Sequence, residues 1–89
     1  MNRPLSELEN RAIVPLVYVS QELRDECVQI ARDKSPSASF DAAIRVARLA
    51  GFGEWDAIGI AKATRWLSVI RCDHGLEKFE GVVRTLAAF

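Results

Sequence analysis

The residues with the clearest capacity for chemistry are the thiol, carboxylate and imidazole of Cys72-Asp73-His74. A zinc site would need further ligands at regular spacing, and Cys27 is the only other thiol in the chain. A nucleophilic Cys–His pair is also disfavoured, because sequence neighbours seldom point at each other and no orienting group is evident. We therefore interpret the segment as a polar turn that closes a helix. We expect a protein that is not an enzyme, with no catalytic residue, metal, cofactor or small-molecule substrate.

Several cations have the capacity to contact phosphate. Arg45 and Arg48 share one face of a predicted helix, and Lys34 precedes Ser37 and Ser39 at its expected start. Phosphate contact by this shared face makes Arg45 and Arg48 candidate DNA-binding residues. The alternative is a solvated helix face, which is the more common reason for such charge pairs.

The composition limits the class of protein. The chain has 89 residues, of which 49% are hydrophobic, and its 12 basic residues balance its 12 acidic residues. These values predict one folded domain over residues 1–89 and argue against the strong positive field of a protein that coats nucleic acid. The sequence has no run of about eighteen uncharged apolar residues and no secretory signal at its start. We therefore expect no membrane association and a cytoplasmic location with reduced thiols.

Residue types that are typical of turns divide the domain into an arm over residues 1–11, a core over residues 12–50 and a C-terminal helical pair over residues 51–89. Residues 12–19 are rich in β-branched and aromatic side chains, which predicts a strand. Pro15 cannot donate to a ladder and would confine this strand to an edge or to a two-stranded ribbon. The arm has capping-box spacing and forms either one or two helical turns or a mobile segment.

Four helices are predicted after the strand. Ser20 has the residue type of an N-cap, and the helix after it would place Arg24 on its solvent face. A second helix would begin after Ser37 or Ser39 and stop at Gly51, whose freedom to adopt positive φ suits a C-cap. The remaining two helices are expected over residues 54–71 and 76–86. The predicted fold is therefore mainly α, with one short N-terminal strand followed by four helices, and an all-α bundle is the alternative.

The predicted helix over residues 54–71 has the widest apolar arc, which includes Trp55 and Trp66. We interpret both rings as core rather than as platforms for stacked bases. An arc wider than half the circumference needs neighbours on more than one side, which favours partner subunits. Gly59 and Ala63 lie four residues apart and would let another helix approach closely.

Three segments in the core follow a recognisable order. Residues 17–23 read VYVSQEL, residues 30–34 read IARDK, and residues 37–47 read SASFDAAIRVA. An apolar strand, a helix start with Glu-Leu, a serine-rich turn and an Ile-Arg-x-Ala helix follow one another over about residues 13–50. This order resembles the ribbon-helix-helix family of dimeric repressors and antitoxins.

The resemblance implies a homodimer in which two strands pair as an antiparallel ribbon that enters the DNA major groove. The start of the second helix holds a phosphate in that family, which here implies the backbone of residues 37–40 with help from Lys34. The resemblance thus adds Lys34, Ser37 and Ser39 to the candidate DNA-binding residues. In the same register Val14, Leu16 and Tyr18 would face the groove. The two extra helices after Gly51 would pack over this core or over the partner chain.

The apolar character of Val14 and Leu16 departs from the family, because base readout needs groups such as Arg, Lys, Asn or Gln. Such a face is better explained if the C-terminal helices or another protein cover it. A helix-turn-helix over residues 40–71 is a further interpretation, but it would aim acidic and apolar side chains at DNA.

Two functions remain open on the sequence. The first is a small non-enzymatic, dimeric DNA-binding regulator of repressor or antitoxin type. The alternative is a protein-binding adaptor or inhibitor that presents an apolar surface and does not bind DNA. Its candidate partner-binding residues are Val14, Leu16, Tyr18 and Trp55.

Overall fold

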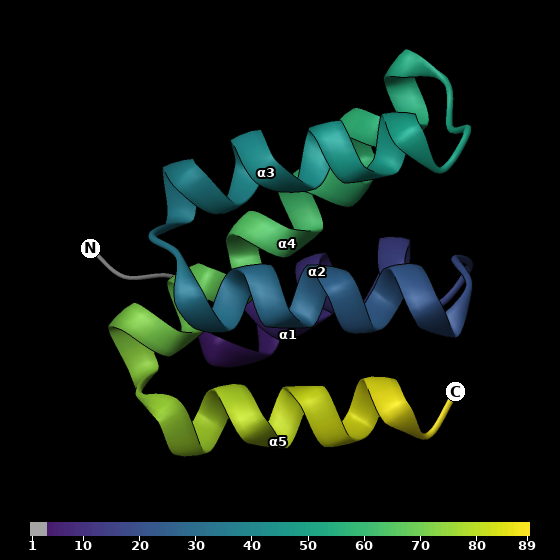
Figure 1. Cartoon of the computed structure of the whole chain (residues 1–89). Helices are drawn as coiled ribbons and strands as arrows, with labels where there is room; N and C mark the ends of the chain where they lie inside the picture. The colour runs from purple at the N-terminus through teal and green to yellow at the C-terminus, as the bar shows by residue number, and fades with distance from the viewer. Residues whose placement is uncertain (1–3) are drawn as a thin grey trace.

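The computed structural model describes residues 4–89 and folds them into five α-helices. They are α1 (Leu5–Leu16), α2 (Gln21–Asp33), α3 (Pro36–Leu49), α4 (Glu54–His74) and α5 (Leu76–Ala87). In Figure 1, α3 lies above α2, α5 lies below α2, and α4 passes behind them. The described residues contain no strand, so the mainly α class is confirmed and the N-terminal strand is wrong.

Helix α1 spans the boundary between the predicted arm and the predicted strand, and residues 1–3 of the predicted arm lie outside the described residues. Leu8, Ala12 and Leu16 repeat at helical spacing across the predicted boundary at residue 12, and each is at most 1% exposed. Burial of this stripe outweighs the β-propensity of the residues between, because propensity is a weak prior that tertiary context overrides. Pro15 is tolerated in the last turn of α1. Without a strand in residues 12–19, the ribbon-helix-helix core is not supported.

Helix α4 is the centre of the bundle and packs against each of the other four helices. Small side chains dominate its interior positions, which lets its neighbours approach closely. The wide apolar arc therefore has neighbours within the same chain, and its width alone does not require a second subunit. The buried residues of α4 are Ala57, Ile60, Ala61, Ala63, Thr64, Leu67, Ser68 and Ile70.

Some of the predicted helix ends are confirmed and others are not. Ser20 is the N-cap of α2, since its Oγ accepts from the N–H of Leu23 at 3.2 Å. Gly51 adopts the expected positive φ of 100° after α3. Helix α3 begins earlier than predicted, because Ser35 is its N-cap and Ser37 and Ser39 are not.

Arg24 is buried at 5% exposure rather than on the solvent face of α2. Its guanidinium donates to the carbonyl oxygens of Leu16 at 3.0 Å, of Val17 and Val19 at 3.2 Å, and of Leu86 at 3.0 Å. These are carbonyls of the α1–α2 corner and of the end of α5. A single side chain therefore joins α1, α2 and α5 at one corner of the bundle.

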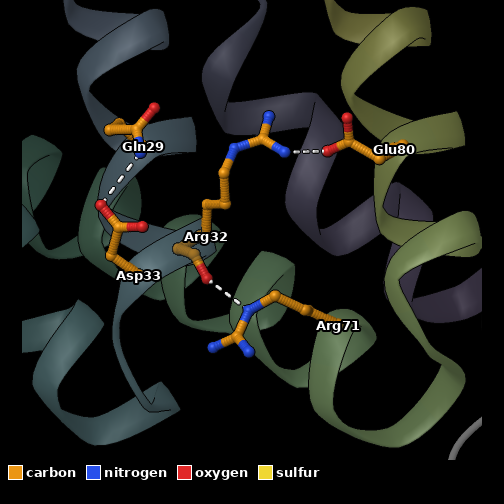
Figure 2. Close-up of polar contacts among 6 residues, drawn as sticks. Gln29, Arg32, Asp33, Arg71 and Glu80 are labelled. Carbon is orange, nitrogen blue, oxygen red and sulfur yellow. Dashed lines mark hydrogen bonds and ion pairs between the residues drawn. The ribbon is translucent and has the colours of Figure 1, made fainter.

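A second arginine donates hydrogen bonds to backbone carbonyls at the C-terminal end of α2. Arg71 donates to the carbonyl oxygens of Ala31 at 2.9 Å and of Lys34 at 2.8 Å, and the Lys34 carbonyl also accepts from Ser39 and Ser68. Figure 2 shows Arg71 reaching from α4 to the end of α2, and Arg32 of α2 paired with Glu80 of α5. The C-terminal end of α2 is thus fixed by Ser68 and Arg71 of α4, whereas at its N-terminal end Arg24 of α2 itself reaches out to its neighbours.

Candidate functional site

Two neighbouring hollows lie between the C-terminal half of α1 and the N-terminal half of α4. The first has a volume of about 260 Å³ and the second about 310 Å³. Pro15 and Gly59 line both hollows and form the saddle between them. We name this region the α1–α4 surface, and its principal residues are Val14, Pro15, Tyr18, Phe52, Trp55, Asp56, Gly59, Lys62 and Trp66.

The α1–α4 surface carries large apolar side chains that the monomer does not cover. Tyr18 and Trp55 are each 84% exposed, and Val14 is 54% exposed. Tyr18 lies just beyond the end of α1, four residues after Val14, so both follow the outward stripe of that helix. Trp55 lies in the first turn of α4, before the helix enters the core. The prediction that Trp55 belongs to the core is therefore wrong.

The other tryptophan is half-buried at the far end of the same surface. The guanidinium of Arg11 lies 5.8 Å from the centre of a Trp66 ring, and that of Arg65 lies 5.5 Å from it. Contacts of this length are cation–π interactions. Trp66 is therefore partly packed, and Trp55 is the tryptophan available to a partner.

Charges of opposite sign mark the two hollows. Asp56 lines the first hollow, whereas Arg11 and Lys62 line the second. Arg11 pairs with Glu7 at 3.1 Å, but neither Asp56 nor Lys62 forms an ion pair within residues 4–89. The surface is therefore apolar along its centre, with a negative charge at one end and positive charges at the other.

The structure brings together three of the four predicted partner-binding residues. Tyr18 and Trp55 line the same hollow, and Val14 lines the second. Leu16 is not on this surface, because it is 0% exposed and belongs to the inward stripe of α1. The strand prediction placed residues 14, 16 and 18 on one face, whereas a helix places residues 14 and 18 together and turns residue 16 inward.

The predicted DNA-binding residues are divided between surface and core. Lys34, Ser37, Arg45 and Arg48 are exposed, but Ser39 is buried. The Ser39 hydroxyl donates to the carbonyl of Lys34 at 3.2 Å, so it is committed inside the bundle. The proposed phosphate clamp therefore lacks this member.

Lys34 and Arg45 do share a groove of about 440 Å³ between α2 and α3. The groove also contains the carboxylates Glu26 and Asp33 and the exposed Leu49. Opposite charges in one groove weaken the attraction for a phosphate backbone, since the net field governs such contacts.

The Cys72-Asp73-His74 segment forms the end of α4 rather than a turn after it, and Gly75 ends the helix with a φ of 94°. Cys72 is exposed, while Nε2 of His74 is buried without a hydrogen-bond partner in the described part of the chain. Cys27 is buried, and desolvation raises the pKa of its thiol against the opposing hydrogen bond to Thr64. A raised pKa keeps this thiol protonated and unreactive.

Within residues 4–89 no three His, Cys, Asp or Glu side chains lie close enough together to hold a metal ion. In the same residues no helix combines the length and apolar character needed to cross a bilayer.

Sequence reasoning did not assign Pro15, Phe52 or Lys62 to a binding surface. The signal for Lys62 was available, because Trp55, Gly59, Lys62 and Trp66 repeat at four, three and four residues along one face of α4. The signal for Pro15 depended on recognising α1 as a helix. Phe52 had no such signal, because its position follows from the turn after α3.

Comparison of the chain with protein-family models, with curated proteins and with solved structures gave no match.

Proposed function

We propose that this protein acts by binding a protein chain through the α1–α4 surface, without catalysing a reaction. The observation that carries the proposal is the exposure of Tyr18 and Trp55 beside one hollow. Tyrosine and tryptophan are the residue types that most often dominate binding energy when a partner desolvates them. Single exposed apolar residues are ordinary on a protein surface, but aromatic rings gathered around a hollow are typical of an interaction site.

The charges indicate what kind of partner fits. An apolar centre flanked by Asp56 and Lys62 suits a helix face that has its own apolar stripe and charges of opposite sign. A small-molecule substrate is a poorer fit, because both hollows are shallow and open.

Site-specific photo-crosslinking tests this proposal in cells that produce the protein. A benzophenone amino acid replaces Tyr18 in one variant and Leu49 in the control, which is 89% exposed but lies at the end of α3. We expect protein adducts from position 18 and few from position 49. No adduct from position 18, or equal yields from both positions, would contradict the proposal.

DNA binding is a second candidate function, carried by the exposed cations Lys34, Arg45 and Arg48. None of the three forms an ion pair within residues 4–89. Titration of a fluorescently labelled random duplex at about 50 mM and about 200 mM salt tests it, because phosphate contacts weaken steeply with salt. If the basic surface binds DNA, replacing Arg45 and Arg48 with Ala should flatten the salt slope. Unchanged binding by that variant would remove this surface from consideration.

A further inference from the structure

The occupant of the α1–α4 surface can be inferred from the symmetry of its own residues. Gly59 lies at the saddle between the hollows. Two residues of opposite charge lie on α4 at equal spacing on either side of it. Asp56 precedes Gly59 by three residues, and Lys62 follows it by three. The first hollow with its exposed rings lies on the N-terminal side, and the second lies on the C-terminal side.

A two-fold axis through such a saddle exchanges its two sides. Two antiparallel copies of α4 that meet at Gly59 would place Asp56 of each copy at the level of Lys62 of the other. The same operation brings the exposed rings of Tyr18 and Trp55 to the level of the partner's second hollow. The surface is therefore complementary to itself in charge.

The backbone at the saddle permits this approach. A Cβ added at Gly59 would meet no atom within 4 Å, so the space above the glycine is open in the monomer. A glycine at a helix crossing lets two backbones come closer than any other residue allows. Asp56 and Lys62, which have no ion-pair partner within the described chain, would find partners across the axis.

We propose that a second copy of this chain occupies the α1–α4 surface, in an antiparallel pairing of α4 about Gly59. The inference rests on the proposed function, because it names the partner of the same surface. The dimer would cover Val14, Tyr18 and Trp55 in both copies and would leave the groove between α2 and α3 free.

Sedimentation velocity over about 1–100 μM measures the association. We expect wild type to shift from monomer to dimer in this range, and Trp55→Ser to remain monomeric. Leu49→Ser is the matched control, since it removes an equally exposed apolar side chain outside the surface and should dimerise like wild type. A monomeric wild type at 100 μM, or a dimeric Trp55→Ser, would overturn the proposal.

Charge reversal tests the antiparallel register. Asp56→Lys and Lys62→Asp each place like charges opposite one another in a homodimer, so each should weaken self-association roughly tenfold. An equimolar mixture of the two variants restores opposite charges at both positions, and it should dimerise nearly as well as wild type. A mixture that associates no better than either variant alone would refute the register.

The two proposals fail in different ways. If wild type stays monomeric while position 18 crosslinks to a different protein, the second copy is refuted and the protein-binding function stands. If position 18 yields no adduct with any protein, the function fails together with the dimer.

Discussion

At the α1–α2 corner the guanidinium of Arg24 satisfies four backbone carbonyls, whereas on the α1–α4 surface Tyr18 and Trp55 remain largely exposed. The corner directs a polar group inward, and the surface directs apolar groups outward. Both arrangements reverse the usual preference of the residue type. The corner therefore stabilises the fold, whereas the surface is available for binding.

The largest effect should come from Leu16→Asp, because this substitution buries a charge at a fully buried position. We expect a loss of about 4 kcal/mol or more in the free energy of unfolding, which is enough to unfold many small domains. Chemical denaturation followed by circular dichroism measures this loss.

Val14→Asp is the control for Leu16→Asp, two residues earlier on the exposed side of α1. It should change stability by less than about 0.5 kcal/mol and should abolish self-association. Equal destabilisation by both substitutions would mean that α1 does not separate its two faces as described.

Arg24→Leu tests the corner and should cost about 3 kcal/mol, since it leaves the buried Val19 carbonyl without a donor. It also removes one of the two hydrogen bonds to each of the buried carbonyls of Leu16 and Leu86. Arg32→Leu on the same helix removes a partly exposed ion pair with Glu80 and a cation–π contact with Phe79, and it should cost less, about 1 kcal/mol. The midpoint of urea denaturation compares the two variants. A similar cost for both would refute the role of Arg24 as the tie between α1, α2 and α5.

The smallest expected change in stability has the opposite sign. Gly59→Ala should stabilise the monomer by about 0.5–1 kcal/mol, because alanine favours a helix interior and its Cβ meets open space. The same substitution should weaken self-association, since it separates the crossing helices. Thermal unfolding of dilute protein and sedimentation of concentrated protein measure the two effects separately.

Gly81→Ala provides the matched control for Gly59→Ala. Gly81 also lies inside a helix, and an added Cβ would make only an ordinary contact with Arg84 at 3.8 Å. We expect a similar gain in stability with no change in association. Stronger association of Gly59→Ala than of this control would contradict a close helix crossing at Gly59.

The sequence predicted α2, α4, α5 and the turn at Gly51 because local signals decide them. The N-cap Ser20 and the glycines with positive φ carry their own conformational preference. α1 was missed because β-branched residues and Pro15 obscured a longer stripe of Leu8, Ala12 and Leu16. That stripe crosses residue 12, where the local composition had suggested a boundary between the arm and the strand.

The candidate site was predictable only in part. Val14, Tyr18 and Trp55 were selected as apolar partner-binding residues, and the helix brings them to one surface. The burial of Arg24 was not predictable, because its acceptors include the Leu86 carbonyl at the far end of the chain. Likewise, the sequence around Ser39 predicts phosphate binding, because it does not reveal that the Ser39 hydroxyl donates to the Lys34 carbonyl inside the bundle.

A series of amide and indole NMR spectra from about 20 μM to about 500 μM protein tests whether the α1–α4 surface is the interface between two copies. We expect the indole signal of Trp55 and the amide signals of Tyr18 and Gly59 to move together with concentration, while the amide signal of Leu49 stays fixed. Concentration-dependent shifts at Leu49 and Val46, with Trp55 unchanged, would place the interface between α2 and α3 and would refute self-association through the α1–α4 surface.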